Sequence, residues 1–211
     1  MKHLILAVTM LLLVTASFAQ SDKYQKGMEK AIASLDSAKS PDDFTAVAAT
    51  FERIGDAEKS QWLPYYYAGL AHVWRGFRDQ KASKDDIANQ AEAMLEKAET
   101  LEPKAAEIYI AKNMAATIHM LVDPMTRFQK YGAEAAQALG KAKQLEPNNP
   151  RTYFLEGQSL FGTPAAFGGG KDKAKPLFEK SIELFKAYKP ASNLHPTWGL
   201  KSAEDMLARC Q

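Results

Sequence analysis

The sequence predicts an all-α protein that is built from repeated helical hairpins. Helix start signals recur along the chain: Ser40 and Ser83 each precede acidic residues, and Asp123 and Asn149 each stand directly before a proline. Between these signals the apolar residues recur every three or four positions, which places them on one face of a helix. Residues 95–103 (LEKAETLEP) and 139–147 (LGKAKQLEP) are similar and lie 44 positions apart. A repeat of this length indicates helical hairpins, each of which buries its apolar face against a neighbour.

The first nineteen residues have the pattern of a secretory signal peptide. Lys2 is followed by the apolar run 4–14 and then by small residues at Ser17 and Ala19. A membrane span needs roughly 20 apolar residues, which is more than this run provides. A buried N-terminal helix is the alternative interpretation. We therefore expect residues 1–19 to be removed, leaving an exported protein, periplasmic or secreted, with no membrane span.

Charge and cysteine content narrow the possible functions. The formal net charge is +2 over 211 residues, so the composition gives no reason to expect a nucleic-acid or anionic-membrane partner. Cys210 is the single cysteine. An exported chain with one cysteine has no internal disulfide, and its stability must come from packing.

The mature chain divides into five predicted units. Residues 20–60 form a degenerate first hairpin, three hairpins follow over 61–103, 104–147 and 148–189, and 190–211 form a closing helix that caps the stack. The connection inside each of the three hairpins carries extra residues, at 76–86, 119–132 and 162–170. These insertions are expected on the same side of the stack, where they form a shared surface.

The spacing of small residues resembles the tetratricopeptide repeat (TPR) family. Small residues recur in the first helix, early in the second helix and near its end, and two copies end in proline: Gly69, Ala111 and Gly157; Ala91, Ala135 and Ala174; Ala98, Ala142 and Ser181; Pro103 and Pro147. Small side chains at these positions let neighbouring helices approach closely. The copies lie 44 and then 39 residues apart rather than the 34 of that family, because of the insertions. The resemblance implies a helical solenoid and says little about activity.

Four short stretches are similar to exported TPR proteins of Bacteroidetes-type bacteria, a group to which no activity is attached. They are residues 51–72, VDPMTRF at 122–128, the TPAAFGGG loop and HPTWG at 195–199. The glycine loop with the following KDKAKPLFEKSIELF is also similar, more weakly, to the T-component proteins of TRAP transporters.

The TPR resemblance implies a concave groove lined by the first helix of each hairpin. The groove positions carried over from the family hold aromatic, apolar and polar side chains, and the binding candidates among them are Tyr66, Trp74, Ile108, Lys112, Arg151, Phe154 and Gln158. Such a mixture suits an amphipathic segment or a small apolar ligand better than an acidic tail.

The glycine run at 168–170 is the one stretch that invites comparison with a phosphate-binding loop. With Gly170 and Lys171 set on the G-K pair of that motif, Ala165 replaces the first glycine and Asp172 replaces the Ser or Thr that ligates magnesium. We therefore interpret Gly168, Gly169 and Gly170 as a turn before a helix that starts at about Lys171, and keep them as candidate loop contacts.

The sequence holds no catalytic or metal-binding motif: HExxH, CxxC and GxSxG are all missing. We expect no cofactor, no metal and no enzymatic activity. The leading hypothesis is a scaffold that binds a protein partner in the cell envelope. The alternative is a small-molecule-binding or transporter-accessory protein.

Overall fold

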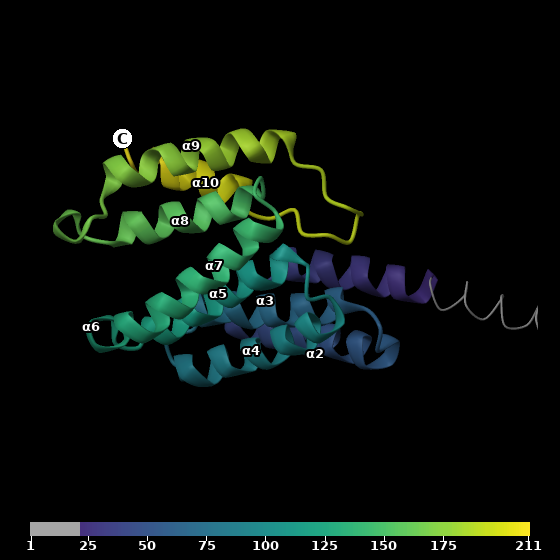
Figure 1. Cartoon of the computed structure of the whole chain (residues 1–211). Helices are drawn as coiled ribbons and strands as arrows, with labels where there is room; N and C mark the ends of the chain where they lie inside the picture. The colour runs from purple at the N-terminus through teal and green to yellow at the C-terminus, as the bar shows by residue number, and fades with distance from the viewer. Residues whose placement is uncertain (1–21) are drawn as a thin grey trace, which may run out of the picture.

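The computed structural model describes residues 22–211, which form helices joined by short connections (Figure 1). The predicted signal peptide, residues 1–19, lies outside the described residues. No strand occurs between residues 22 and 211, which confirms the all-α prediction. No helix in this part of the chain is both long and apolar enough to cross a membrane.

The helices follow one another closely along the chain. After a helix over 22–37 come α2 (Pro41–Glu58), α3 (Trp62–Arg78), α4 (Lys84–Leu101), α5 (Ala106–Met120), α6 (Pro124–Arg127), the π-helical turn η1 (Phe128–Gly132), α7 (Ala133–Leu145), α8 (Pro150–Gly162), the 3₁₀ turn η2 (Ala165–Phe167), α9 (Lys171–Ala187) and α10 (Leu200–Ala208).

The predicted start signals cap these helices. The Ser40 side chain accepts a hydrogen bond from the N–H of Asp43, whose carboxylate accepts in return from the N–H of Ser40. Ser83, Asp123 and Asn149 cap α4, α6 and α8 in the same way, each accepting from a backbone N–H in the first turn. The local sequence therefore fixes where these four helices begin.

Small residues do bring neighbouring helices together, as the sequence predicts. A Cβ at Gly69 of α3 would lie 2.8 Å from Leu95 of α4, and a Cβ at Gly157 of α8 would lie 2.7 Å from the ring of Phe178 of α9. Helices adjacent in sequence pack on each other from α2 to α5, then α5 on α7, α8 on α9 and α9 on α10. The core is one continuous apolar cluster through these contacts.

The C-terminal part differs from the expected closing helix. Only Leu200–Ala208 is helical, and it packs on α9. Residues 188–199 have no regular helix and run back across the molecule before α10 (Figure 1). Gly199 ends this segment at φ 122°, and any Cβ there would meet the Phe185 ring at 2.4 Å. That backbone, which favours glycine, delays the start of the helix.

Two of the expected insertions are also more ordered than open loops. α3 continues to Arg78, and Asp79 closes the turn after it by accepting from the N–H groups of Lys81 and Ala82. The 119–132 insertion is largely helical, as α6 and η1. The third, after α8, is a loop, and α9 begins at Lys171 as predicted.

Candidate functional site

The predicted groove is filled by the chain itself. Residues 188–199 lie against α3 and α8, where the groove candidates are. The indole N–H of Trp198 donates to the hydroxyl of Tyr66 at 3.1 Å, and the hydroxyl of Tyr67 donates to the carbonyl of Leu194 at 2.9 Å. Tyr66 is fully buried as a result. The groove is therefore occupied by a segment of the same chain, residues 188–199.

Arg151 is the strongest anchor of this arrangement, and it is 0% exposed. Its Nη1 group donates to the carboxylate of Glu107 at 3.0 Å, and its Nη2 group donates to the carbonyl of Pro196 at 2.7 Å. The guanidinium lies 5.0 Å from the centres of the Tyr188 and Trp198 rings. Burial lowers the pKa of Arg151, but Glu107, Tyr66 and Tyr188 together raise it by more, so the net shift is upward and the guanidinium stays charged. Arg151 therefore fastens the C-terminal segment and is not available to a partner.

The other groove candidates are mostly occupied too. Ile108 and Phe154 are buried in the core. Lys112 is paired with Glu99, and Trp74 is half-buried with its ring edge-on to Trp198 at 6.3 Å. Gln158 is exposed on α8. The expectation of an open groove is corrected here, because the segment 188–199 covers Tyr66 and Arg151 and the core buries Ile108 and Phe154.

The backbone N–H groups of the glycine loop are already hydrogen-bonded within the chain. The N–H groups of Gly168, Gly169 and Gly170 donate to carbonyl oxygens of Ala165, Pro164 and Leu160. Gly168 and Gly170 adopt φ 87° and 110°, the positive values that the turn interpretation requires. The loop therefore presents no row of free N–H groups to a phosphate.

Large exposed apolar side chains gather instead on the connection between α5 and α7. Four of them define what we call the apolar loop surface: Leu121, Val122, Met125 and Phe128, which are 41%, 44%, 92% and 61% exposed. A soluble surface normally keeps such side chains apart, and a contiguous set of them marks a binding site. Three of the four belong to the VDPMTRF stretch, so the signal was present in the sequence without a stated role.

Local geometry explains why these side chains point outward. Asp123 and Pro124 start α6 immediately after α5 ends, so the chain turns on the surface rather than through the core. The π-helical turn η1 then joins α6 to α7. The ring of Phe128 packs on the backbone of Gly132, where a Cβ would come within 3.3 Å of it. Phe128 thereby keeps a fixed position while most of its ring stays exposed.

A partly buried polar cluster adjoins the apolar loop surface. The carboxylate of Asp85, on α4, lies 2.6 Å from Nη1 of Arg127 and 2.7 Å from Nδ1 of His119. The His119 ring stacks on Tyr131, with ring centres 4.7 Å apart. Hydrogen bonds from Arg127 and His119 hold the pKa of Asp85 below its ordinary value, so the carboxylate is ionised. The cluster ties the 121–131 region to the start of α4.

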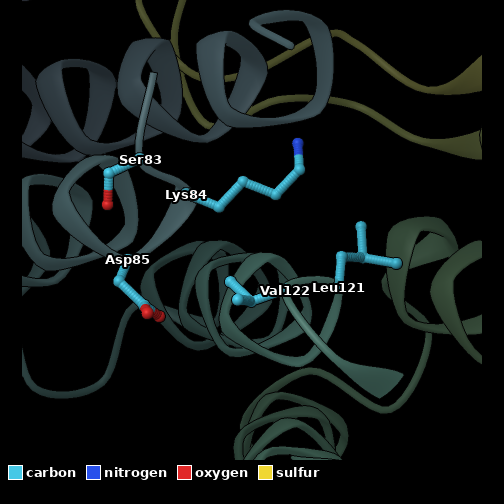
Figure 2. A pocket seen from close by; sticks show the side chains of 5 residues that line it. All are labelled: Ser83, Lys84, Asp85, Leu121 and Val122. Carbon is cyan, nitrogen blue, oxygen red and sulfur yellow. The ribbon is translucent and has the colours of Figure 1, made fainter. Parts of the chain in front are cut away.

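A pocket of about 280 Å³ opens between the start of α4 and the end of α5. Its walls are Ser83, Lys84, Asp85, Leu121 and Val122 (Figure 2). The Lys84 side chain and the Asp85 carboxylate point away from each other at the start of α4, and the Lys84 ammonium donates to the carbonyl of Gly76. The pocket is therefore continuous with the apolar loop surface and carries one cation at its edge.

Comparison with known proteins gives one informative likeness. No family model matches the chain, and none of the curated proteins is similar to it. The solved structure of the HusA haemophore from Porphyromonas gingivalis matches with a TM-score of 0.81 and 40% sequence identity. The match covers 89% of this chain and 92% of that chain.

This likeness overturns two predictions. The assignment to the TPR family, with its exported members and the TRAP T-components, is wrong: the small-residue pattern reflects close packing of helices, which other helical folds also need. The leading hypothesis of a protein-binding scaffold is wrong as well, because the similar protein is a haemophore and the groove is already filled. The small-molecule alternative is the better supported one. With 40% identity across most of both chains, the protein belongs to the family of the HusA haemophore.

Proposed function

We propose that this protein binds haem and carries it as cargo outside the cytoplasm. The observation that carries the proposal is the similarity to the HusA haemophore at 40% identity over 92% of that protein. A carrier needs no catalytic step, and we propose none. Export rests on the signal-peptide pattern of residues 1–19 and on the same similarity. The stacking of the hairpins as a regular solenoid stays a prediction.

The apolar loop surface is the place we propose for haem. Haem is a flat apolar macrocycle with two carboxylate side chains, so it needs exposed apolar contacts and a cation nearby. Met125 and Phe128 supply the largest exposed apolar groups, and Lys84 supplies the cation at the pocket edge. Covering about 100 Å² of these side chains at about 25 cal/mol per Å² favours binding by about 2.5 kcal/mol.

The groove is a less favourable place for the same ligand. Haem there would have to displace residues 188–199, breaking the Trp198 to Tyr66 hydrogen bond and the contact of Arg151 with the Pro196 carbonyl. Arg151 would then keep Glu107 as a partner but lose the rings of Tyr188 and Trp198. The apolar loop surface needs no such rearrangement, because its side chains are already exposed.

The test is a haem titration of the mature chain, followed by absorbance of the haem Soret band. We expect saturable binding by the unchanged protein. The variant Met125→Ser/Phe128→Ser is expected to raise Kd by between about one and two orders of magnitude, from the area lost. Both side chains are exposed, so the fold should be retained, as circular dichroism will show.

Leu101→Ser is the matched control. Leu101 is a partly exposed apolar residue at the far end of α4, about 25 Å from Lys84 along the helix. We expect its Kd to equal that of the unchanged protein. Failure of the unchanged protein to bind haem contradicts the function. Equal weakening by the Leu101 and Met125/Phe128 variants contradicts the site.

A further inference from the structure

Lys84 is the cation of the pocket that lacks a carboxylate partner. Among residues 22–211, its ammonium has one hydrogen-bond acceptor, the carbonyl oxygen of Gly76 at 2.9 Å, and no ion pair. An ammonium has three N–H donors, so donors remain for a ligand. Asp85 follows it in sequence, but that carboxylate is already engaged by Arg127 and His119. The charge of Lys84 is therefore uncompensated at the mouth of the pocket.

The other cations near the apolar loop surface are committed elsewhere. Arg127 is paired with Asp85, and this pairing raises the pKa of Arg127. The ammonium of Lys130 lies 4.6 Å from the centre of the Tyr131 ring, and 3.5 Å from its hydroxyl. Neither of them lines the pocket. A carboxylate that enters the pocket thus meets Lys84 before any other cation.

The pocket and the apolar loop surface can hold different parts of a haem because they differ in size. A pocket of about 280 Å³ accepts a carboxylate side chain and the macrocycle edge that bears it, and it is too small for a whole haem. The apolar walls, Leu121 and Val122, lead from the pocket to Met125 and Phe128. A ligand with an acidic edge and an apolar body would place its acidic edge in the pocket and its apolar body on Met125 and Phe128.

Resting on the haem-carrier function proposed above, we propose that Lys84 binds a propionate carboxylate of haem in this pocket. The macrocycle lies outside the pocket on the apolar loop surface. Lys84 thereby orients the cargo with its acidic edge toward the start of α4. It also makes the protein selective for porphyrins that carry a free carboxylate.

The test compares haem with its dimethyl ester, in which both propionates are neutral. The unchanged protein is expected to bind haem about tenfold more tightly than the ester, a difference typical of one charge-assisted hydrogen bond at a partly exposed site. Lys84→Met is expected to reduce this preference to nearly one by weakening haem binding while leaving ester binding unchanged. Lys84→Arg keeps the charge and is expected to retain most of the preference.

Lys81→Met is the matched control, since Lys81 is an exposed lysine three residues away that does not line the pocket. It should retain the preference for haem. Equal binding of haem and ester by the unchanged protein overturns the role of Lys84 and leaves the haem-carrier function intact. Equal loss of both ligands in Lys84→Met, or loss of the preference in Lys81→Met, also overturns it. If neither ligand binds the unchanged protein, the proposed function itself fails.

Discussion

Replacing Arg151 with methionine removes the cation that fastens the C-terminal segment to the helices. Methionine fills part of the volume, but Glu107 is left 4% exposed without its charged partner. Breaking a buried ion pair in this way costs about 3–5 kcal/mol. For a chain of this size each kcal/mol lowers Tm by about 2–4 °C, so the expected loss is about 6–20 °C.

The same variant should gain a pH dependence whose sign follows from Glu107. Burial raises the pKa of Glu107 even with Arg151 present, and removing Arg151 raises it further. In the unfolded chain a glutamate ionises near about pH 4.3, before the buried one does. Stability is therefore present at low pH and is lost as pH rises toward the folded pKa. The variant should be less stable at about pH 8 than at about pH 5.

Urea unfolding followed by circular dichroism measures both effects, with Glu107→Gln/Arg151→Met as the internal comparison. The double variant has no buried unpaired charge, so we expect it to be more stable than Arg151→Met alone by about 1–3 kcal/mol. The reasoning is refuted if the single variant loses less than about 1 kcal/mol. It is also refuted if the single variant has no pH dependence, or if the double variant is as unstable as the single variants combined.

Two further predictions concern the glycine loop and a buried imidazole. Gly169→Ala places a Cβ 2.1 Å from the carbonyl oxygen of Thr163, so thermal unfolding should show a loss of stability of about 1–3 kcal/mol, with haem affinity unchanged at temperatures where the variant is folded. At Gly168 the space is open and only the positive φ opposes a Cβ, so Gly168→Ala should cost about 1 kcal/mol of stability. Equal losses in the two variants would contradict the packing argument. Burial, and to a lesser extent Arg75, lowers the pKa of His72 to about 4. As pH drops from about 6.5 to about 4 the unfolded state takes up a proton before the folded state does, so the stability of the protein falls. In urea unfolding, His72→Gln should lose less stability over this pH range, and an unchanged pH dependence would contradict the role of His72.

Helix starts and close packing could be read from the sequence because both depend on local residue types. Serine, aspartate and asparagine side chains cap a helix when they directly precede its first turn. The structure shows this at all four predicted positions, Ser40, Ser83, Asp123 and Asn149. The sequence identifies Gly157 as a small residue that permits close approach, and the structure supplies its neighbour, the large Phe178. These features give the all-α class and the hairpin pairing.

The groove could not be judged from the sequence because its occupant is distant along the chain. Residues 188–199 meet Tyr66 and Arg151 through contacts that span more than 40 positions, and no local pattern marks them. Positions such as Ile108 and Phe154 have groove-like spacing, but they are buried in the core. Met125 and Phe128 lie in the 119–132 insertion, which the sequence places on the surface, but their exposure depends on the short α6 and the turn η1, which the sequence pattern does not predict.

The most direct test of the haem site is an NMR titration of the ¹⁵N-labelled mature chain with ferric haem, whose paramagnetic iron broadens nearby amide signals. We predict that broadening is concentrated at residues 83–85 and 121–131 and leaves the amides of 188–199 sharp. Broadening confined to residues 188–199 and α8, with 121–131 unaffected, would place haem in the groove after displacement of that segment and contradict the account.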